Sequence, residues 1–211
     1  YFMNGLPTET YEDIEGIAAL AKKVDHEFYT VPGRVKGKAP MITISVSCFV
    51  PKPFTAFQWE GQDTLEELVD KQNHLRDCVR GEKHIRYNWH EAKVSRIEAV
   101  FARGDRKLSR ALLEAHRMGL KFDGWDEFFD YDKWLEAFRL AGVDPAFYAN
   151  RDFGLDEVLP WDVIDCGVTK EFFRREREKA YCSKTTPNCR EHCSGCGANR
   201  LGGERTCCPH Q

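Results

Sequence analysis

Four cysteines lie close together near the C-terminal end of this 211-residue sequence. Their spacing is C-x6-C-x3-C-x2-C, and the residues are Cys182, Cys189, Cys193 and Cys196. Thiolates are soft ligands, so four of them in one short segment suit a zinc ion or an iron–sulfur cluster. Pro187, Gly195 and Gly197 interrupt the segment. The sequence therefore predicts a loop that folds around a metal.

The identity of the metal and of the fourth ligand stays open. Zinc as a structural clasp is the plainer interpretation of the spacing, and His192 could replace one cysteine. Cys207 and Cys208 are adjacent, so chelation by both is awkward, but one could serve if Cys182 does not. The remaining cysteines fall in predicted elements, where a thiol packs as a small buried hydrophobe; they are Cys48, Cys78 and Cys166.

The composition indicates a globular protein, since 42% of the residues are hydrophobic. A net charge of −3 gives no general attraction to nucleic acid. No apolar run approaches the roughly 18 residues of a membrane span, so no membrane partner is expected. The sequence shows no signal peptide, and cysteines clustered at metal-ligand spacing favour metal over disulfides. We expect a reduced, cytoplasmic setting.

The N-terminal residues have the pattern of a βα unit, in which ligands bind at the turn between the strand and the helix. Tyr1 to Met3 is strand-like and is followed by the turn residues Asn4 to Pro7. Thr10 and Asp13 have the spacing of a capping box. One apolar helical face follows, formed by Ile14, Ile17, Ala18, Ala21 and Val24. Because the sequence begins inside this strand without an initiator methionine, we expect a fragment of a longer protein.

Residues 41–50 form the clearest strand, because β-branched residues alternate along it. The residues expected on one face are Ile42, Ile44, Val46 and Cys48. With the first strand and helix they predict a parallel β-α-β crossover. Further helices are predicted over residues 63–80, 90–103, 105–118 and 169–181, and a short edge strand over 84–89.

Residues 124–161 are rich in aromatic side chains. Aromatic residues at helical spacing usually form core, and stacking on nucleobases is the sharper alternative. His90 and Glu91 stand at a helix start, where capping and surface packing are the plainer roles and a catalytic pair is the alternative.

Several motifs together resemble the C-terminal part of radical S-adenosylmethionine (SAM) enzymes. Phe-Met-Asn-Gly-Leu-Pro-Thr-Glu-Thr resembles a late barrel strand and its turn beside SAM, and residues 45–59 resemble the last strand with its exit loop. Residues 90–98, 122–127 and 185–197 resemble the tail of an uncharacterised branch that carries a cobalamin-binding-like domain ahead of the barrel. The resemblance runs from Tyr1 to about Ala198 and gives no role to the residues after Leu201.

The resemblance implies an α/β fold, the C-terminal fragment of a partial (β/α) radical SAM barrel. Residues 1–61 would supply the last two barrel strands, and residues 62–168 a helical, aromatic-rich extension. Residues 169–211 would form a helix and a cysteine-rich, metal-binding tail. The partner would be the missing N-terminal half of the barrel.

The resemblance also implies cofactors and site residues. SAM would be flanked by Met3, Asn4, Gly5 and Glu9. The SAM-binding iron–sulfur cluster would lie outside the chain, with an auxiliary cluster or zinc at the C-terminal cysteines and cobalamin in the intact protein. The chain alone should be inactive, because it lacks the loop for that cluster. Substrate and reaction type stay open, RNA and protein both being candidate substrates. The alternative function is a non-catalytic zinc-binding module that binds RNA or a protein partner.

Overall fold

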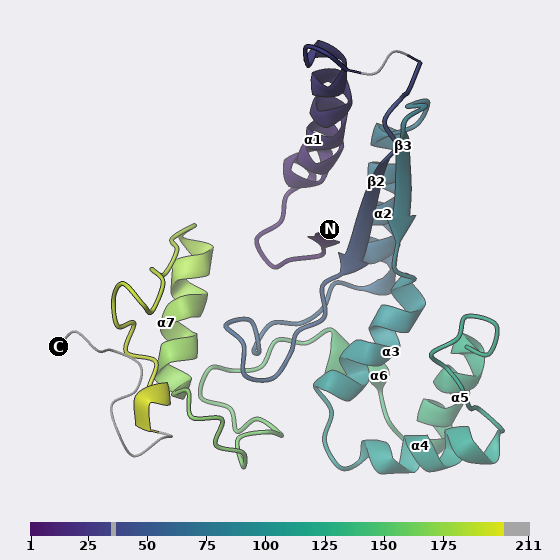
Figure 1. The fold of residues 1–211 in the computed structure, drawn as a ribbon. Coiled ribbons are helices and arrows are strands. Elements are labelled where there is room, and N and C mark those ends of the chain that lie inside the picture. Colours follow the sequence, from purple (N-terminus) through teal and green to yellow (C-terminus); the bar gives the residue numbers. More distant parts are fainter. Residues whose placement is uncertain (35–36, 201–211) are drawn as a thin grey trace.

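The computed structural model describes residues 1–34 and 37–200 (Figure 1). The strands are β1 (Phe2–Asn4), β2 (Ile42–Cys48) and β3 (Ile85–Trp89). The α-helices are α1 (Tyr11–Thr30), α2 (Leu65–Cys78), α3 (Ala92–Ala102), α4 (Leu108–Arg117), α5 (Tyr131–Ala141), α6 (Pro145–Ala149) and α7 (Lys170–Tyr181). A short 3-10 helix, η1, covers Ala198–Arg200. These bounds confirm the predicted helices and strands to within a few residues.

The three strands form one sheet in the order β1-β2-β3, and both strand pairs are parallel. Helix α1 connects β1 to β2, and helix α2 connects β2 to β3. The predicted parallel β-α-β crossover is therefore confirmed. The third strand pairs with β2, so the sheet continues past residue 61, the boundary expected from the resemblance.

One face of the sheet packs against both connecting helices. Ile44 is 1% exposed and Val46 is 3% exposed, and both belong to a single apolar cluster with α1 and α2. The helical members of that cluster are Ile14, Ile17, Ala18 and Ala21 from α1, with Leu75 from α2. Capping boxes at Thr10 and Thr64 begin the two helices. The predicted inward face of β2 and the first capping box are thus confirmed.

The opposite face of the sheet carries different residues. Strand register aligns Met3 with Ser47, and Ser45 with Asn88. Met3, Ser47 and Asn88 are exposed, and Ser45 is half-buried. Parallel sheets are usually covered on both faces and built of apolar residues. This sheet has one helix-covered apolar face and one open, mostly polar face.

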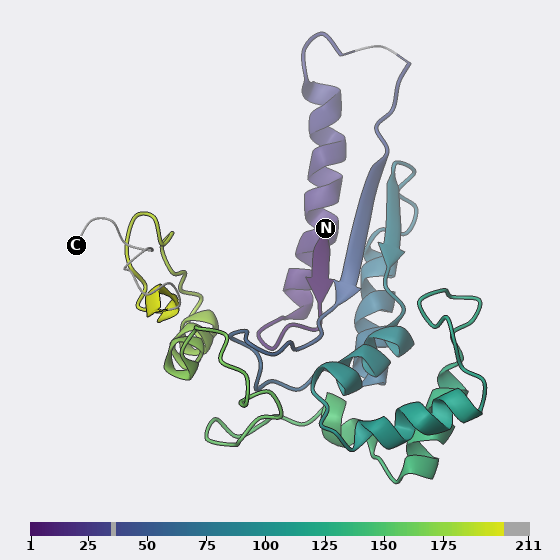
Figure 2. The same ribbon diagram turned by 60° about the horizontal axis from the view of Figure 1, so that its bottom comes forward.

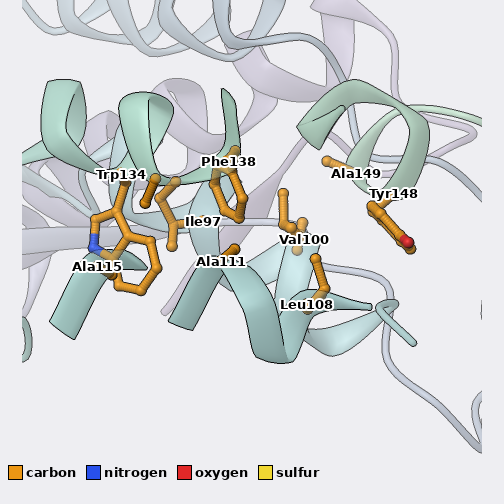
Figure 3. Close-up of a cluster of buried hydrophobic side chains, with 11 residues drawn as sticks. Ile97, Val100, Leu108, Ala111, Ala115, Trp134, Phe138, Tyr148 and Ala149 are labelled. Atoms are coloured by element: carbon orange, nitrogen blue, oxygen red, sulfur yellow. The ribbon is translucent and has the colours of Figure 1, made fainter. Parts of the chain in front are cut away.

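The residues after β3 form a helical layer with its own core (Figure 3). Its buried side chains come from α3, α4, α5 and α6, and include Ile97, Val100, Leu108, Ala111, Trp134, Phe138 and Tyr148. Trp134 and Phe138 confirm the plainer reading of the aromatic region as core. Phe122, Trp125 and Phe128 do not, because each is more than half exposed.

Helix α7 stands apart from α4 and α5, beside the loop that follows β2 (Figure 2). None of its residues is buried. A small apolar cluster lies between that loop and the segment before α7, and it contains Trp59, Phe153, Leu159 and Trp161. No α-helix of residues 1–34 and 37–200 combines the length and the hydropathy that a membrane crossing requires.

Candidate functional site

The turn after β1 lies at the carboxyl end of the sheet, where parallel folds place their ligands. The carbonyl of Asn4 accepts a hydrogen bond from the Phe49 backbone N–H at 2.7 Å. Gly5 follows with φ +83°, and a Cβ added there would lie 2.9 Å from Cδ2 of Leu68. Only glycine fits both the backbone conformation and the space.

The Glu9 side chain holds the backbone of this turn. Its Oε2 accepts a hydrogen bond from the Gly5 N–H at 2.7 Å. The Lys71 ammonium lies 3.1 Å from Glu9 and 2.7 Å from Asp63. Burial lowers the pKa of Lys71, but its hydrogen bonds to Asp63 and Glu9 outweigh this effect and raise the pKa overall. The Glu9 side chain is 5% exposed, so it shapes the turn through Gly5 and Lys71.

Met3 and Asn4 point to opposite sides of β1. Met3 is 42% exposed on the open face, whereas Asn4 is 2% exposed under the helices. The Oδ1 atom of Asn4 has no hydrogen-bond partner among the described residues. The structure therefore brings the four residues predicted to flank SAM to one turn, and it presents the Met3 side chain to the open face.

A second group of side chains lies around the carboxyl ends of β2 and β3. Gln72 Nε2 donates to the carbonyl of His90 at 2.8 Å and lies 3.3 Å from the Cys48 sulfur. His90 Nδ1 lies 2.8 Å from the Ser95 hydroxyl. Burial raises the pKa of the Cys48 thiol, as expected for a small buried side chain. Of these residues only His90 directly follows a strand, so the contacts of Gln72 and Ser95 with it had no signal in the sequence.

His90 and Glu91 are not arranged as a catalytic pair. Glu91 is the N-cap of α3 but makes no side-chain capping hydrogen bond. His90 is fixed by Ser95 instead. Surface packing describes both residues.

The open face has a hollow of about 320 Å³ at its carboxyl end. Tyr1, Ser45, Ser47, Asn88 and His90 are among the residues that line it. Phe2, Val46 and Trp89 also line it, so its surface is mostly apolar with a few groups that can donate or accept hydrogen bonds. This combination suits a ligand that has both apolar surface and polar groups.

The loop after β2 joins the sheet to α7 through Glu60, which is only 5% exposed. The Glu60 carboxylate pairs with the Arg177 guanidinium and accepts a 2.9 Å hydrogen bond from the Tyr181 hydroxyl. In the same loop Gln58 Oε1 accepts a 2.7 Å hydrogen bond from the Trp161 indole. These contacts hold α7 and the segment before it to the loop after β2.

After α7 the chain turns back along the helix. Cys182 caps the C-terminal end of α7. The Thr186 hydroxyl then lies 2.8 Å from Lys179 Nζ, and the Arg175 guanidinium donates to the carbonyls of Ser194 and Gly195. The Cys196 carbonyl finally accepts from the N–H of Thr169, the N-cap of α7, at 2.9 Å.

This return path separates Cys182 from Cys196. A 12-residue helix is about 18 Å long. Two thiolates on one zinc ion, each about 2.3 Å from the metal, lie at most about 4.6 Å apart. Among residues 1–34 and 37–200, no three His, Cys, Asp or Glu side chains are grouped to hold a metal ion. The structure thus places the four predicted ligands along one helix without gathering them. Cys207 and Cys208 lie outside the described residues.

The expectation that all three scattered cysteines are buried in regular elements is fully confirmed only for Cys48. Cys48 is buried in β2, as expected, and Cys78 is half-buried at the end of α2. Cys166 is half-buried in the irregular segment just before α7. It lines a hollow of about 450 Å³ together with Phe54 and Asp162.

Comparison with known proteins finds a distant relative. No protein-family model matches the chain. An uncharacterised protein of Methanocaldococcus jannaschii is 35% identical over 112 residues, which is 53% of this chain and 22% of that protein. The chain therefore spans about a fifth of the length of the relative that it matches. No solved structure matches the chain.

Proposed function

We propose that the chain is the C-terminal portion of a radical SAM iron–sulfur enzyme, in which the sheet supplies late strands of a partial barrel. The observation that carries this proposal is the polar open face, with Ser45, Ser47 and Asn88 opposite the apolar helix-covered face. In a barrel the helices lie outside, so the inner face of the sheet carries no helix, and ligands bind at the carboxyl ends of the strands. In a doubly wound sheet, helices cover both faces, so both faces would be apolar.

The residues around the first turn fit the binding of SAM in distinct ways. Met3 presents its side chain to the lumen side, and Asn4 and Gly5 bring the backbone close to the ligand. Glu9 holds the Gly5 amide at 2.7 Å and so acts as a positioning residue. In the intact protein, a bound iron–sulfur cluster would supply the single electron needed for reductive cleavage of SAM, and this chain's residues would hold SAM in place.

The C-terminal loop is proposed to bind zinc or an auxiliary iron–sulfur cluster. Its donor set is sulfur, and Gly195 and Gly197 adopt φ values of +67° and +97°, which permit the tight turns of a metal-binding knuckle. Metal sites of this kind form as the metal binds, because the thiols must lose protons and the loop must close. Residues 62–168 would then close the mouth of the barrel, and cobalamin would bind in the N-terminal domain.

The test of the barrel proposal uses the intact protein with the residues encoded before Tyr1. We expect those residues to contain a C-x3-C-x2-C motif followed by several βα units. We also expect the anaerobically reconstituted protein, supplied with a low-potential one-electron reductant, to convert SAM to methionine and 5′-deoxyadenosine, the latter after its radical takes a hydrogen atom from substrate or solvent components. A different upstream domain, or no cleavage of SAM by a protein whose iron–sulfur cluster is intact, would overturn the proposal.

The test of the metal proposal uses the present chain, purified without oxygen. Iron with matching acid-labile sulfide indicates an auxiliary cluster, and stoichiometric zinc without sulfide indicates a structural clasp. The matched control is the Cys193→Ala, Cys196→Ala variant, which should lose either metal. Metal retained by that variant, or absent from the parent chain, would overturn this part of the proposal.

A second candidate function is a non-catalytic zinc-binding module for RNA or a protein partner. The observation that favours it is the exposure of Phe122 (65%), Trp125 (63%) and Phe128 (53%) on one loop. A neighbouring hollow of about 630 Å³ is lined by residues that include Lys93, Lys121, Lys133, Glu127, Asp130 and Asp132. Such balanced charge suits a protein better than a polyanion. Tight, salt-dependent binding of single-stranded RNA that Trp125→Ala abolishes would establish the RNA alternative instead.

A further inference from the structure

The segment just before α7 contacts the cysteine loop. The N–H of Thr169 donates to the carbonyl of Cys196 at 2.9 Å. A Cβ added to Gly197 would lie 2.8 Å from Cγ2 of Thr169 and 3.4 Å from the carbonyl oxygen of Gly167. The backbone of residues 167–169 therefore runs against the backbone of residues 196–197, and glycine is required at Gly197 for this close approach.

Cys166 directly precedes this contact. Gly167, the next residue, has φ +77° and allows a sharp turn between Cys166 and the helix. The Cys166 sulfur lies 3.6 Å from the Val168 carbonyl, so its side chain turns towards the end of the segment that meets the cysteine loop. Cys166 is half-buried and lines the hollow of about 450 Å³ at the start of α7.

Cys189 and Cys193 lie in the part of the loop that leads to this contact. The N–H groups of Glu191 and His192 donate to the Asn188 carbonyl, which forms a turn that contains Cys189 and ends just before Cys193. Metal binding would have to bring the Cys189 side chain to the same side as Cys193. The Arg175 guanidinium, within the first two turns of α7, holds the Ser194 and Gly195 carbonyls at 3.2 Å.

Electrostatics also favours this end of α7. The N-terminus of a helix carries partial positive charge and stabilises thiolates, whereas the C-terminus carries partial negative charge. Cys196 lies at the N-terminal end and Cys182 at the C-terminal end, where Glu178 is also exposed. Two side chains oppose this preference, since Glu171 lies in the first turn and Lys179 in the last. Arg175, which contacts the loop, adds positive charge near the N-terminal end.

We propose that Cys166, Cys189, Cys193 and Cys196 form the ligand set and that Cys182 stays outside it. This inference rests on the proposed metal site at the C-terminal cysteines and replaces one of its ligands. Binding of a thiophilic metal closes residues 188–197 onto Cys166 within one end of α7. Recruitment of Cys182 would instead require that residue to cross the length of the helix, about 18 Å.

The test is a zinc titration of the full chain against a competing chelator. Cys166→Ser is expected to weaken zinc binding by at least about 100-fold, the scale reached by second-shell changes alone. Cys182→Ser is expected to leave the affinity unchanged, and Cys196→Ser serves as the positive control for loss of a ligand. Circular dichroism of each variant verifies that the helices have formed.

A second measurement uses the unaltered chain and does not depend on variant folding. Zinc-loaded protein is treated with iodoacetamide, and the modified cysteines are identified by mass spectrometry. We expect Cys182 to be alkylated and Cys166 to be protected until the zinc is chelated. Alkylation of Cys166 with Cys182 protected would overturn the assignment.

The possible outcomes separate this inference from the proposal on which it rests. If zinc binding is lost in Cys196→Ser and Cys182→Ser but kept in Cys166→Ser, the metal site stands and the choice of Cys166 is overturned. Equal losses in Cys166→Ser and Cys182→Ser also overturn it. If the unaltered chain binds neither zinc nor iron, the metal site itself fails.

Discussion

The Glu60 carboxylate accepts a hydrogen bond from the Tyr181 hydroxyl at 2.9 Å, across 121 positions of sequence. The same carboxylate pairs with Arg177, and its side chain is 7% exposed. Hydrogen bonds to charged groups contribute about 1.5 to 3 kcal/mol each. Since α7 buries none of its residues completely, this contact is a main attachment of the helix.

Glu60→Gln should therefore loosen α7. We expect faster hydrogen exchange of the α7 amides, corresponding to about 1.5 to 3 kcal/mol of lost local stability. The sheet amides should keep their protection. Glu178→Gln is the matched control, since Glu178 is exposed on the same helix. Equal exchange in both variants would mean that Glu60 does not hold the helix.

The turn after β1 should tolerate no side chain at Gly5. Gly5→Ala combines a left-handed φ with a contact to Leu68, and we expect about 2 to 4 kcal/mol of destabilisation in urea unfolding. Gly33→Ala provides the comparison, because Gly33 has a similar φ of +79° but no atom within 4 Å of the added Cβ. The control should cost only about 1 to 2 kcal/mol. A cost no larger at Gly5 than at Gly33 would contradict the close packing against Leu68.

Arg103 should be hard to replace, because its guanidinium is completely buried. It donates to the backbone carbonyls of Tyr148, Ala149 and Arg151 and lies 4.2 Å from the Phe153 ring centroid. Burial, followed by the charge of Arg151, lowers the pKa of Arg103 to about 10, so the group stays charged at neutral pH.

Arg103→Lys keeps the charge and loses the planar fork, so we expect a loss of about 2 to 4 kcal/mol in the free energy of unfolding. The measurement is urea denaturation, with the exposed Arg110→Lys as control. If the two variants were equally stable, the three carbonyl contacts would not contribute to stability.

The capping box of α2 should make stability depend on pH. The backbone N–H of Thr64, and next its hydroxyl, donate to Glu67 and lower the pKa of this carboxyl below its ordinary value of 4.5. A carboxyl whose pKa is lower in the folded state stabilises the fold above its unfolded pKa. That contribution is lost as the pH falls from 4.5 through the folded pKa.

Glu67→Gln should therefore cost about 0.5 kcal/mol at neutral pH and nothing in strong acid. Urea unfolding at both conditions measures the difference, and Glu66→Gln, in the same helical turn, is the control. A cost independent of pH would show that the charge of Glu67 plays no part.

The sheet was predictable because its signals are local. Ile42, Ile44, Val46 and Cys48 alternate with exposed or half-buried residues, and Thr10 has its capping partner Asp13 three positions later. The pairing of β3 was harder to foresee, since only Ile85 and Tyr87 of this strand turn inward. Strand β3 pairs with β2 because α2 runs back along the sheet and brings the chain to the edge of β2.

The environment of the cysteines was not predictable from spacing. Cys166 lies 30 positions before Cys196, and only the path of the chain back along α7 brings their segments together. Similarly, nothing in the pattern distinguishes the buried Trp134 from the exposed Trp125. Trp134 lies in α5 on the side that packs against α4, whereas Trp125 lies in the loop between these two helices.

Strand β1 is three residues long and forms the outer edge of the sheet. The backbone N–H and C=O groups on its outer side can form hydrogen bonds with another strand. Met3 lies on the open face of the sheet and Phe2 on the helix-covered face. A strand that pairs with β1 must therefore place a small polar residue beside Met3 and an apolar residue beside Phe2. A shift of the pairing by one residue would exchange the two faces. Two residues thus fix the register of any strand that pairs with this edge.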